Sequence, residues 1–122
     1  MEIMTWHLFE RACQFLKIKI MDYGVDSIYG VPRGGMVVAV ELSHLLSLPI
    51  VEKPKKTTLI VDDICDSGKT LEKYCRKNYI TAVLYYNKNA IIRPTMWALT
   101  KHEFVKFPWE TNDSAKIDYT CQ

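Results

Sequence analysis

The sequence predicts an α/β fold in which helices flank an open, mainly parallel, twisted sheet. Apolar runs rich in β-branched residues alternate along the chain with longer stretches of helical periodicity. This alternation is the pattern from which right-handed crossovers build a parallel sheet. The run 57–61 (Thr-Thr-Leu-Ile-Val) is β-branched and apolar without strict alternation, as expected of a central strand that is covered on both faces.

Length and composition indicate one globular domain, 1–122. A chain of 122 residues with 48% apolar and 25% charged side chains can bury a core, which excludes wholesale disorder. Sixteen basic and fourteen acidic residues give a net charge of +2, too balanced to indicate binding to nucleic acid or a membrane surface. No apolar run approaches the ~18 residues of a membrane helix, and no signal-peptide pattern opens the chain. We therefore expect a soluble, cytoplasmic protein that binds neither nucleic acid nor membrane.

The first half of the chain predicts two helices around one strand. Apolar residues in steps of three and four indicate an amphipathic helix capped by Thr5 and ended near Gly24: Trp6, Phe9, Cys13, Leu16 and Ile20. A short strand follows at 27–31. Residues 36–48 are apolar on most faces, which predicts a largely buried helix that Pro49 ends.

The rest of the chain predicts five further strands and one helix. After a brief strand at 49–51, we expect the central strand 57–61, a helix over 69–77 and strands at 79–86, 95–100 and 104–107. The polar tail 111–122 is expected to fray. The four cysteines form no CxxC pair and the three histidines lie far apart, so we expect reduced thiols and no structural zinc.

The segment 61–70 (Val-Asp-Asp-Ile-Cys-Asp-Ser-Gly-Lys-Thr) carries the strongest functional signal. Its second half, Asp66-Ser67-Gly68-Lys69-Thr70, is typical of an anion-binding turn between a strand and a helix, where backbone N–H groups and hydroxyls converge on a phosphate. Gly-Lys-Thr also ends the nucleoside-triphosphate P-loop, but that motif needs a glycine where this chain has Asp63. Asp62 and Asp63 could instead accept hydrogen bonds from the vicinal hydroxyls of a ribose, which suggests a ribose 5-phosphate ligand.

Residues 61–70 resemble the motif with which type I phosphoribosyltransferases bind 5-phosphoribosyl 1-diphosphate (PRPP). Upstream, the segment 29–36 resembles the pyrophosphate loop of that family, and Arg33, Gly34 and Gly35 are its implied phosphate-binding residues. Glycines there let backbone amides face a diphosphate, and arginine can donate two hydrogen bonds to it. The resemblance implies the type I phosphoribosyltransferase fold, with a small C-terminal hood at about 94–110.

The downstream residues resemble the xanthine-guanine and hypoxanthine (6-oxopurine) branch of the family. By that similarity, Lys88 contacts the exocyclic oxygen of the purine, Phe104 stacks on it, and Val105 offers backbone groups to its edge. The resemblance also makes Asp62 and Asp63 the ligands of Mg²⁺, and Asp66 the group that takes a proton from, or hydrogen-bonds, purine N7. The implied partners are PRPP, a 6-oxopurine base, a nucleoside monophosphate and pyrophosphate, in a homodimer or larger homo-oligomer.

One departure from the family leaves alternatives open. Family members carry a long flexible loop before the PRPP strand, whereas only 51–58 is available here. Exclusion of water protects an oxocarbenium-like state, so a shortened loop is compatible with a non-catalytic PRPP- or nucleotide-binding regulator on the same fold. A transferase for another acceptor base is the third reading. The sequence does not decide among hypoxanthine, guanine and xanthine.

Overall fold

A computed structural model describes residues 1–111 of the 122-residue chain. In chain order its elements are β1 (Glu2–Ile3), α1 (Trp6–Ile20), the 3-10 turn η1 (Met21–Tyr23), β2 (Ser27–Gly30), α2 (Gly34–Leu46), β3 (Thr58–Cys65), α3 (Lys69–Arg76), β4 (Thr81–Tyr86), β5 (Met96–Thr100) and β6 (Val105–Lys106). The α/β class is confirmed. The tail expected to fray, 111–122, lies outside the described residues from 112 on.

The main sheet is parallel throughout, with strand order β2-β3-β4-β5. The brief strand expected at 49–51 is present as a single parallel bridge between Ile28 and Ile50, on the outer side of β2. The chain therefore moves outward from β2 to Ile50 and then crosses back to β3. Such a reversal leaves a crevice beyond the carboxyl ends of β2 and β3, where open α/β sheets bind their ligands.

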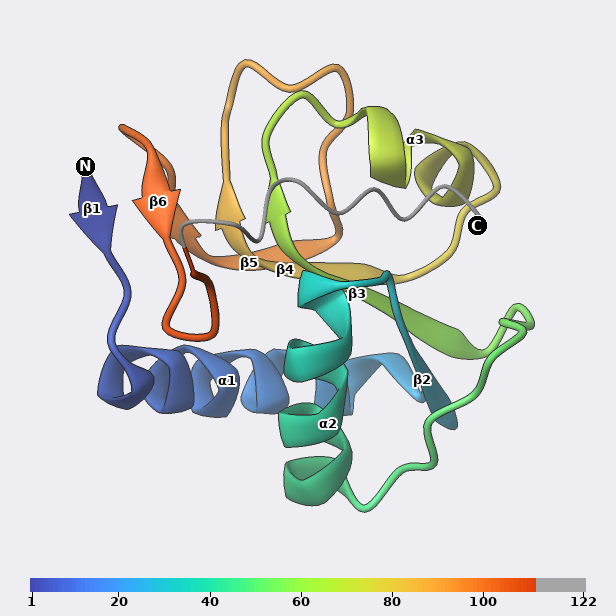
Figure 1. The fold of residues 1–122 in the computed structure, drawn as a ribbon. Coiled ribbons are helices and arrows are strands. Elements are labelled where there is room, and N and C mark those ends of the chain that lie inside the picture. Colours follow the sequence, from blue (N-terminus) through green and yellow to red (C-terminus); the bar gives the residue numbers. More distant parts are fainter. Residues whose placement is uncertain (112–122) are drawn as a thin grey trace.

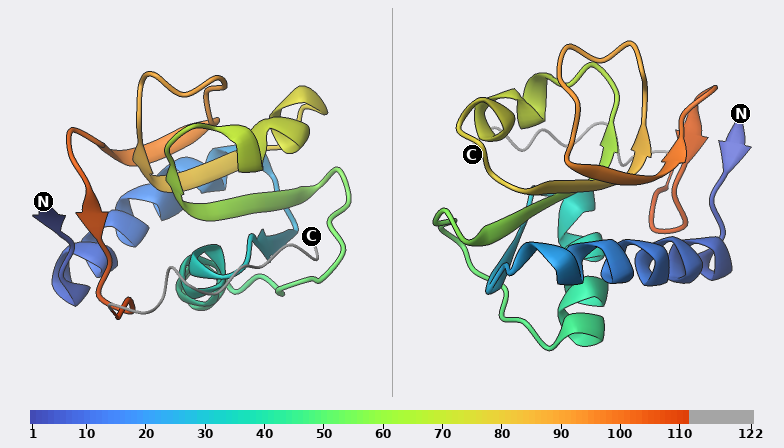
Figure 2. Two further views of the ribbon diagram at one scale, coloured as in Figure 1. Left: turned by 45° about the horizontal axis from the view of Figure 1, so that its top comes forward. Right: turned by 180° about the vertical axis from the view of Figure 1, so that it is seen from behind.

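Helices cover both faces of the main sheet, in three layers. Figure 1 shows α1 and α2 below the sheet and α3 above it, and both views in Figure 2 preserve this division. Below the sheet, buried side chains of the helices and the strands form one cluster: Phe9 and Leu16 of α1, Val38 and Leu42 of α2, Leu59 of β3 and Leu84 of β4. Above it, a smaller cluster joins α3 to the sheet: Ile60, Leu71, Tyr74 and Val83. Within residues 1–111, no helix is both long and apolar enough to cross a membrane.

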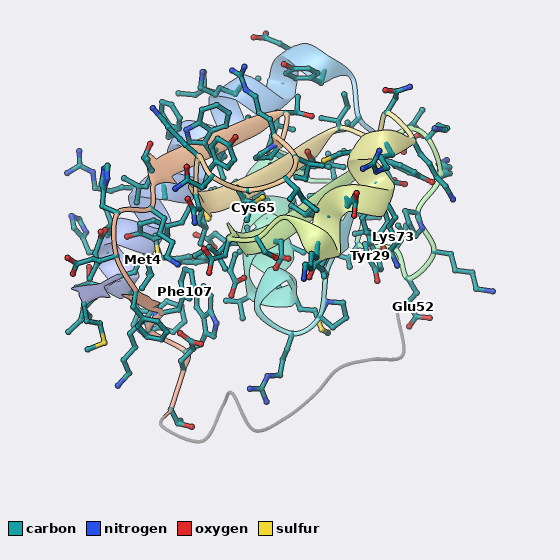
Figure 3. All side chains as sticks on the ribbon, turned by 90° about the horizontal axis from the view of Figure 1, so that it is seen from above. Met4, Tyr29, Glu52, Cys65, Lys73 and Phe107 are labelled. Atoms are coloured by element: carbon teal, nitrogen blue, oxygen red, sulfur yellow. The ribbon has the colours of Figure 1, made fainter. Side chains whose placement is uncertain are left out.

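A second, two-stranded sheet pairs β1 with β6 in parallel register. The N–H of Met4 donates to the carbonyl of Lys106, and the Tyr85 hydroxyl of β4 donates to Glu2 over 2.6 Å, which fastens the small sheet to the large one. Figure 3 shows Met4 and Phe107 on one side of the molecule, with Tyr29 on the other. The expected hood segment 94–110 is thus divided: its first part is β5, a strand of the main sheet, and the rest joins the amino terminus.

Local chemistry explains where the first helix begins and ends. Thr5 caps α1 as predicted, because its hydroxyl accepts a hydrogen bond from the N–H of Leu8 over 3.1 Å. Gly24 ends the following turn with a φ of +66°, a left-handed conformation that glycine adopts without a steric cost.

Several element boundaries differ from the prediction, and two of the differences have a clear structural reason. The helix α2 ends at Leu46, with Ser47 in the left-handed region, so it stops before Pro49 can end it. The strand β3 continues four residues past Val61 to Cys65, because pairing with β4 carries Asp62 and Asp63 into the sheet.

The helix α2 is also less buried than its sequence predicts. Gly35, Val38, Ala39 and Leu42 are buried against the sheet and α1. The side chain of Met36, by contrast, is half exposed, and Val40 is similarly open. Only one of the apolar faces of α2 is therefore buried in the single chain, and another stays exposed to solvent.

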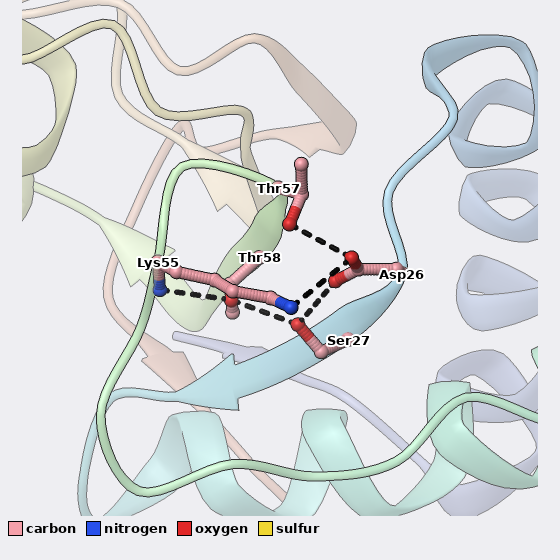
Figure 4. A network of polar contacts seen from close by, with 5 residues as sticks. All are labelled: Asp26, Ser27, Lys55, Thr57 and Thr58. Atoms are coloured by element: carbon pink, nitrogen blue, oxygen red, sulfur yellow. Dashed lines mark hydrogen bonds and ion pairs between the residues drawn. The ribbon is translucent and has the colours of Figure 1, made fainter.

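The connection between residue 51 and β3 is short and fastened at its far end. The carboxylate of Asp26 accepts hydrogen bonds from Ser27 and Thr57 and pairs with Lys55 at 3.4 Å (Figure 4). These bonds hold the pKa of the exposed Asp26 carboxyl below its usual value. The Thr58 hydroxyl extends the network to the Ser27 hydroxyl. The network lies where β2 and β3 begin, at the opposite edge of the sheet from the crevice.

Candidate active site

The glycine-containing loop after β2 lies directly against the two acids of β3. A Cβ built on Gly34 would stand 2.5 Å from Cγ of Asp63 and overlap its carboxylate. A Cβ on Gly35 would stand 2.6 Å from the carbonyl oxygen of Val61 and 3.1 Å from Cα of Asp62. At Gly35 the obstacle is backbone, so a side chain would push the loop away from β3. At Gly34 the obstacle is the Asp63 carboxylate, which a side chain would displace from its present position.

Asp62 and Asp63 form a pair of neighbouring acids, the first buried and the second partly exposed. Asp62 is 8% exposed, and its Oδ1 accepts a hydrogen bond from the backbone N–H of Asp63 over 2.8 Å. Burial raises the pKa of Asp62 well above its usual value, and the neighbouring charge of Asp63 adds to this rise. Burial also raises the pKa of Asp63. Such a pair is poised to bind a cation or hydroxyl groups that offset its charge.

The turn that leads from β3 into α3 forms a small cavity beside the acids. The cavity has a volume of about 240 Å³ and is lined by residues 62–68, Thr70 and Leu71. Gly68 has a φ of +88°, and its place immediately before Lys69 lets the chain turn sharply into the helix. The Ser67 hydroxyl accepts a hydrogen bond from the N–H of Lys69 over 3.2 Å. The turn between strand and helix that the sequence predicted at 66–70 is therefore present, and its binding of a phosphate stays a prediction.

Asp66, the first residue after β3, has two partners that the sequence analysis did not find. Lys101 forms an ion pair with its Oδ1 at 2.8 Å, and the amide of Asn87 donates to the same atom over 2.9 Å. The hydrogen bond from Lys101, followed by that from Asn87, holds the pKa of the Asp66 carboxyl below its usual value. Asp66 is therefore an anion at neutral pH.

A second cavity opens beyond Asn87 and Lys101, with a volume of about 440 Å³. Residues 87–89 and 100–104 line it, so Lys88 and Phe104 face the same space. The ring of Phe104 is 67% exposed and does not belong to the core, whereas Phe107 nearby is buried. Val105 is buried beside this cavity. The strand β1 bonds to the carbonyls of Phe104 and Lys106, and neighbouring carbonyls of a strand point to opposite sides, so the carbonyl of Val105 points away from β1.

Solved structures provide the comparison that decides the family. A purine phosphoribosyltransferase from Pyrococcus horikoshii Ot3 is 31% identical, with a TM-score of 0.79 over 90% of this chain and 94% of that one. This chain belongs to the type I phosphoribosyltransferase family. A scan against protein-family models and a search of curated proteins each gave no match.

Two more distant phosphoribosyltransferases share the fold with different substrates in their names. The xanthine-guanine-hypoxanthine phosphoribosyltransferase of Helicobacter pylori is 20% identical, with a TM-score of 0.80 over 94% of this chain and 97% of that one. The orotate phosphoribosyltransferase of Aeropyrum pernix is 19% identical, with a TM-score of 0.61 over 79% of this chain and 72% of that one. The family is thus shown, and the acceptor base is a separate question.

As a phosphoribosyltransferase, the chain groups the predicted site residues around two cavities. The acids and most of the turn 66–70 line the smaller one, and Lys88 and Phe104 line the larger one, with Val105 buried next to Phe104 in the chain. Arg33 stands at the start of α2, where the Pro32–Arg33 peptide bond is cis, immediately before the two glycines that meet the acids.

The acid pair fits the Mg²⁺ ion that the family resemblance implies. Mg²⁺ prefers oxygen ligands and is commonly held by one or two carboxylates together with phosphates of the substrate. Asp62 and Asp63 supply that donor set, at a place where burial makes an unneutralised pair unfavourable. Within residues 1–111, no group of three or more histidine, cysteine, aspartate or glutamate side chains is placed to hold a metal by protein ligands alone.

Proposed function

We propose that this phosphoribosyltransferase moves the 5-phosphoribosyl group of PRPP to a 6-oxopurine, giving a nucleoside 5′-monophosphate and pyrophosphate. One observation carries the proposal: Asp66 lines the phosphate-sized cavity and, through Asn87 and Lys101, borders the larger one. A sugar held in the first cavity and a base held in the second would meet at Asp66.

The smaller cavity suits the ribose phosphate end of PRPP. The turn 67–70 offers backbone N–H groups and two hydroxyls to the 5-phosphate at the start of α3. Asp62 and Asp63 would accept hydrogen bonds from the ribose hydroxyls, directly or through Mg²⁺. When bound, Mg²⁺ would neutralise charge on the diphosphate that leaves.

The loop after β2 suits the diphosphate. Gly34 and Gly35 bring its backbone against the acid pair, and Arg33 extends from the same loop with a charge opposite to that of the leaving group. A diphosphate bound there would lie between Arg33 and the acids with their cation. Negative charge grows on this group as its bond to C1 breaks, so stabilisation here speeds the reaction.

The transfer breaks one bond to C1 of the ribose and forms another. The electron pair of the C1–O bond leaves with pyrophosphate, and the lone pair of purine N9 forms the new bond to C1. By analogy with glycoside hydrolysis, the transition state has oxocarbenium character. The proton on N7 then moves to the Asp66 carboxylate, which must lie within ~3 Å to accept it.

Two lysines in the larger cavity favour a 6-oxopurine over a 6-aminopurine. Lys88 and Lys101 both line this cavity, and an ammonium group can only donate hydrogen bonds. The acid in the same lining, Glu103, is already paired with the N-terminal amine of Met1 at 2.7 Å. A carbonyl at purine C6 accepts such bonds, whereas the amino group of adenine is itself a donor. The exposed ring of Phe104 offers a face on which either base could stack.

The short connection 51–57 supports a second candidate, a regulator that binds PRPP or a nucleotide without turnover. The chain passes from Val51 to β3 in a few residues and is fastened by Asp26 before it can fold over the site. Transfer to another acceptor base is the third candidate, since orotate phosphoribosyltransferase shares the fold.

A single assay separates the three candidates. Purified protein, Mg²⁺ and PRPP are mixed separately with hypoxanthine, guanine, xanthine, adenine, uracil and orotate, and nucleotides are measured by chromatography. Product with a 6-oxopurine supports the proposal, and product only with another base contradicts its specificity. PRPP binding by calorimetry without any product would favour the regulator.

Two expectations from the sequence stay predictions. Analytical ultracentrifugation measures the oligomeric state, for which we expect a homodimer or larger homo-oligomer. A monomer at micromolar protein concentration would contradict this expectation. The cytoplasmic location is measured by fractionation of the source cells.

A further inference from the structure

The structure assigns a positioning role to Asn87 and Lys101: together they hold one oxygen of Asp66 and leave the other for the base. This inference rests on the proposed function, because it concerns the group that receives the purine proton. Neither residue belongs to the motifs that identify the family in this sequence. Their role follows from the register of three strands.

Asp66, Asn87 and Lys101 are the first residues after β3, β4 and β5. The register pairs Cys65 with Tyr86 and Tyr86 with Thr100, so the three strands end at the same level. The ladder continues one residue further: the N–H of Asn87 donates to Cys65 over 2.9 Å, and that of Lys101 donates to Tyr86 over 2.8 Å. The sheet therefore places these side chains in one row.

Both contacts to the carboxylate go to the same atom. The Asn87 amide lies 2.9 Å and the Lys101 ammonium 2.8 Å from Oδ1 of Asp66. Among residues 1–111, no hydrogen bond or ion pair reaches Oδ2. One oxygen is thus anchored by two donors, and the other stays open to a ligand.

Asn87 is itself held in place. Its side-chain oxygen accepts a hydrogen bond from the N–H of Asn89 over 3.0 Å, and its carbonyl accepts one from Ala90 over 2.9 Å. With the carboxamide oxygen fixed in this turn, its N–H₂ group can only point toward Asp66. The Lys101 side chain is 17% exposed, which restricts its freedom as well.

The hydrogen bond and the ion pair of this row connect the linings of the two cavities. Asp66 lines the smaller cavity, while Asn87 and Lys101 line the larger one. A carboxylate left without these partners would be free to rotate, since its own side chain is about half exposed. Misplacement of a reacting group by ~1 Å can reduce a rate about a hundredfold. The clamp therefore acts on the chemical step more than on PRPP binding.

The test compares Asn87→Ala and Lys101→Met with the wild type. Both variants are expected to lower kcat about ten- to hundredfold and to change the KM for PRPP less than threefold. Lys101→Arg keeps a cation beside Asp66 and is expected to recover most of the rate. Lys77→Met, at the exposed far end of α3, is the matched lysine control and should retain wild-type kinetics.

A second readout does not depend on turnover. Carboxyl NMR titration of Asp66 should show a higher pKa in Lys101→Met and in Asn87→Ala than in the wild type, because each change removes a donor to the ionised form. The acid limb of the kcat/KM profile should move to higher pH in the same variants. Two titratable groups lie next to Asp66. Lys101 is the charged side chain that pairs with it, and the buried thiol of Cys65 belongs to the preceding residue of the chain.

The outcomes are distinct. Unchanged kcat and an unchanged Asp66 pKa in both variants would overturn the clamp even if the wild type is active. Should the wild type make no nucleotide with any base, the proposed function fails, and the NMR titration alone decides whether Asn87 and Lys101 hold Asp66. A variant that does not fold is replaced by Lys101→Gln, which removes the charge, or by Asn87→Asp, which places a like charge beside Asp66; each should raise the pKa of Asp66.

Discussion

Gly34 and Asp63 lie so close that the loop after β2 can meet the acid pair of β3 only where residue 34 lacks a side chain. A Cβ on Gly34 would overlap the Asp63 carboxylate and force it away from the loop. The contact joins two sequence motifs that are nearly thirty residues apart. It therefore fixes the distance between the parts of the site that are proposed to hold the diphosphate and the ribose.

Gly34→Ala is expected to abolish measurable transfer and to destabilise the fold by about 1–3 kcal/mol, the usual cost of overpacking. The added methyl must displace either the loop or the Asp63 carboxylate. Chemical denaturation and steady-state kinetics measure the two effects. Gly24→Asn is the control, because Gly24 is far from the site, has open space around it, and asparagine tolerates its positive φ. Normal kinetics in Gly34→Ala would contradict the assignment of this loop.

Much of the site follows from the sequence because its signals are local. Segment 61–70 combines an apolar strand, two acids and a glycine turn, and each part acts on its neighbours along the chain. The helix cap at Thr5 and the turn at Gly24 were predictable for the same reason. Strand register and long-range pairing carry no such local signal.

The features that the sequence did not predict are non-local. Asn87 and Lys101 reach Asp66 only because β3, β4 and β5 end at the same level. The pairing of β1 with β6 joins the two ends of the described chain. A strand was expected at 104–107, where β6 lies, but its two-residue partner β1 has too little pattern to be recognised. The extension of β3 through the acids likewise depends on pairing with β4, whereas polar residues alone suggest a strand end.

Asp66→Asn is expected to reduce kcat at least a hundredfold while leaving PRPP affinity within about threefold. The amide keeps the shape of the side chain but cannot take a proton, and general-base catalysis typically contributes 10²–10⁴-fold. Single-turnover kinetics and PRPP calorimetry separate the two effects. Equal losses of turnover and PRPP binding would contradict the role of Asp66 as a base and make it a ligand of the sugar phosphate.

Arg33→Ala is expected to weaken pyrophosphate and PRPP binding more than binding of the nucleoside monophosphate product. Only the first two ligands carry the diphosphate for which the loop after β2 is proposed, and charge-assisted hydrogen bonds from arginine are among the strong ones. Calorimetric titration with each of the three ligands measures the difference. Parallel weakening of all three would remove Arg33 from the diphosphate site.

Phe104 and Phe107 are close in the sequence but should respond differently to removal of the ring. Phe104→Ala is expected to raise the KM for the purine about tenfold with little change in melting temperature, because its ring is 67% exposed at the larger cavity. Phe107 is buried and packs on Tyr85 and Trp109, so Phe107→Ala should cost about 3–5 kcal/mol of stability. An unchanged purine KM in Phe104→Ala would show that the ring does not stack on the base.

Asp62→Asn is expected to stabilise the ligand-free protein at neutral pH while it reduces activity. Burial raises the pKa of Asp62 above the usual value of about 4, so the folded state binds this proton more tightly than the unfolded state does. The contribution of Asp62 to stability therefore falls as the pH rises from about 4 through its raised pKa. Asparagine has no such titration, so the gain in melting temperature should be larger at pH 8 than at pH 5.

The same substitution tests the proposed metal site. With chelator present, Asp62→Asn should melt above the wild type at pH 8. Addition of millimolar Mg²⁺ with PRPP should then raise the melting temperature of the wild type more than that of the variant, because a bound cation offsets the charge of an intact acid pair. Asp22→Asn, which removes one exposed carboxylate outside the site, controls for net charge. Equal shifts in the wild type and Asp62→Asn would place the cation elsewhere, since Asp62 would then contribute nothing to its binding.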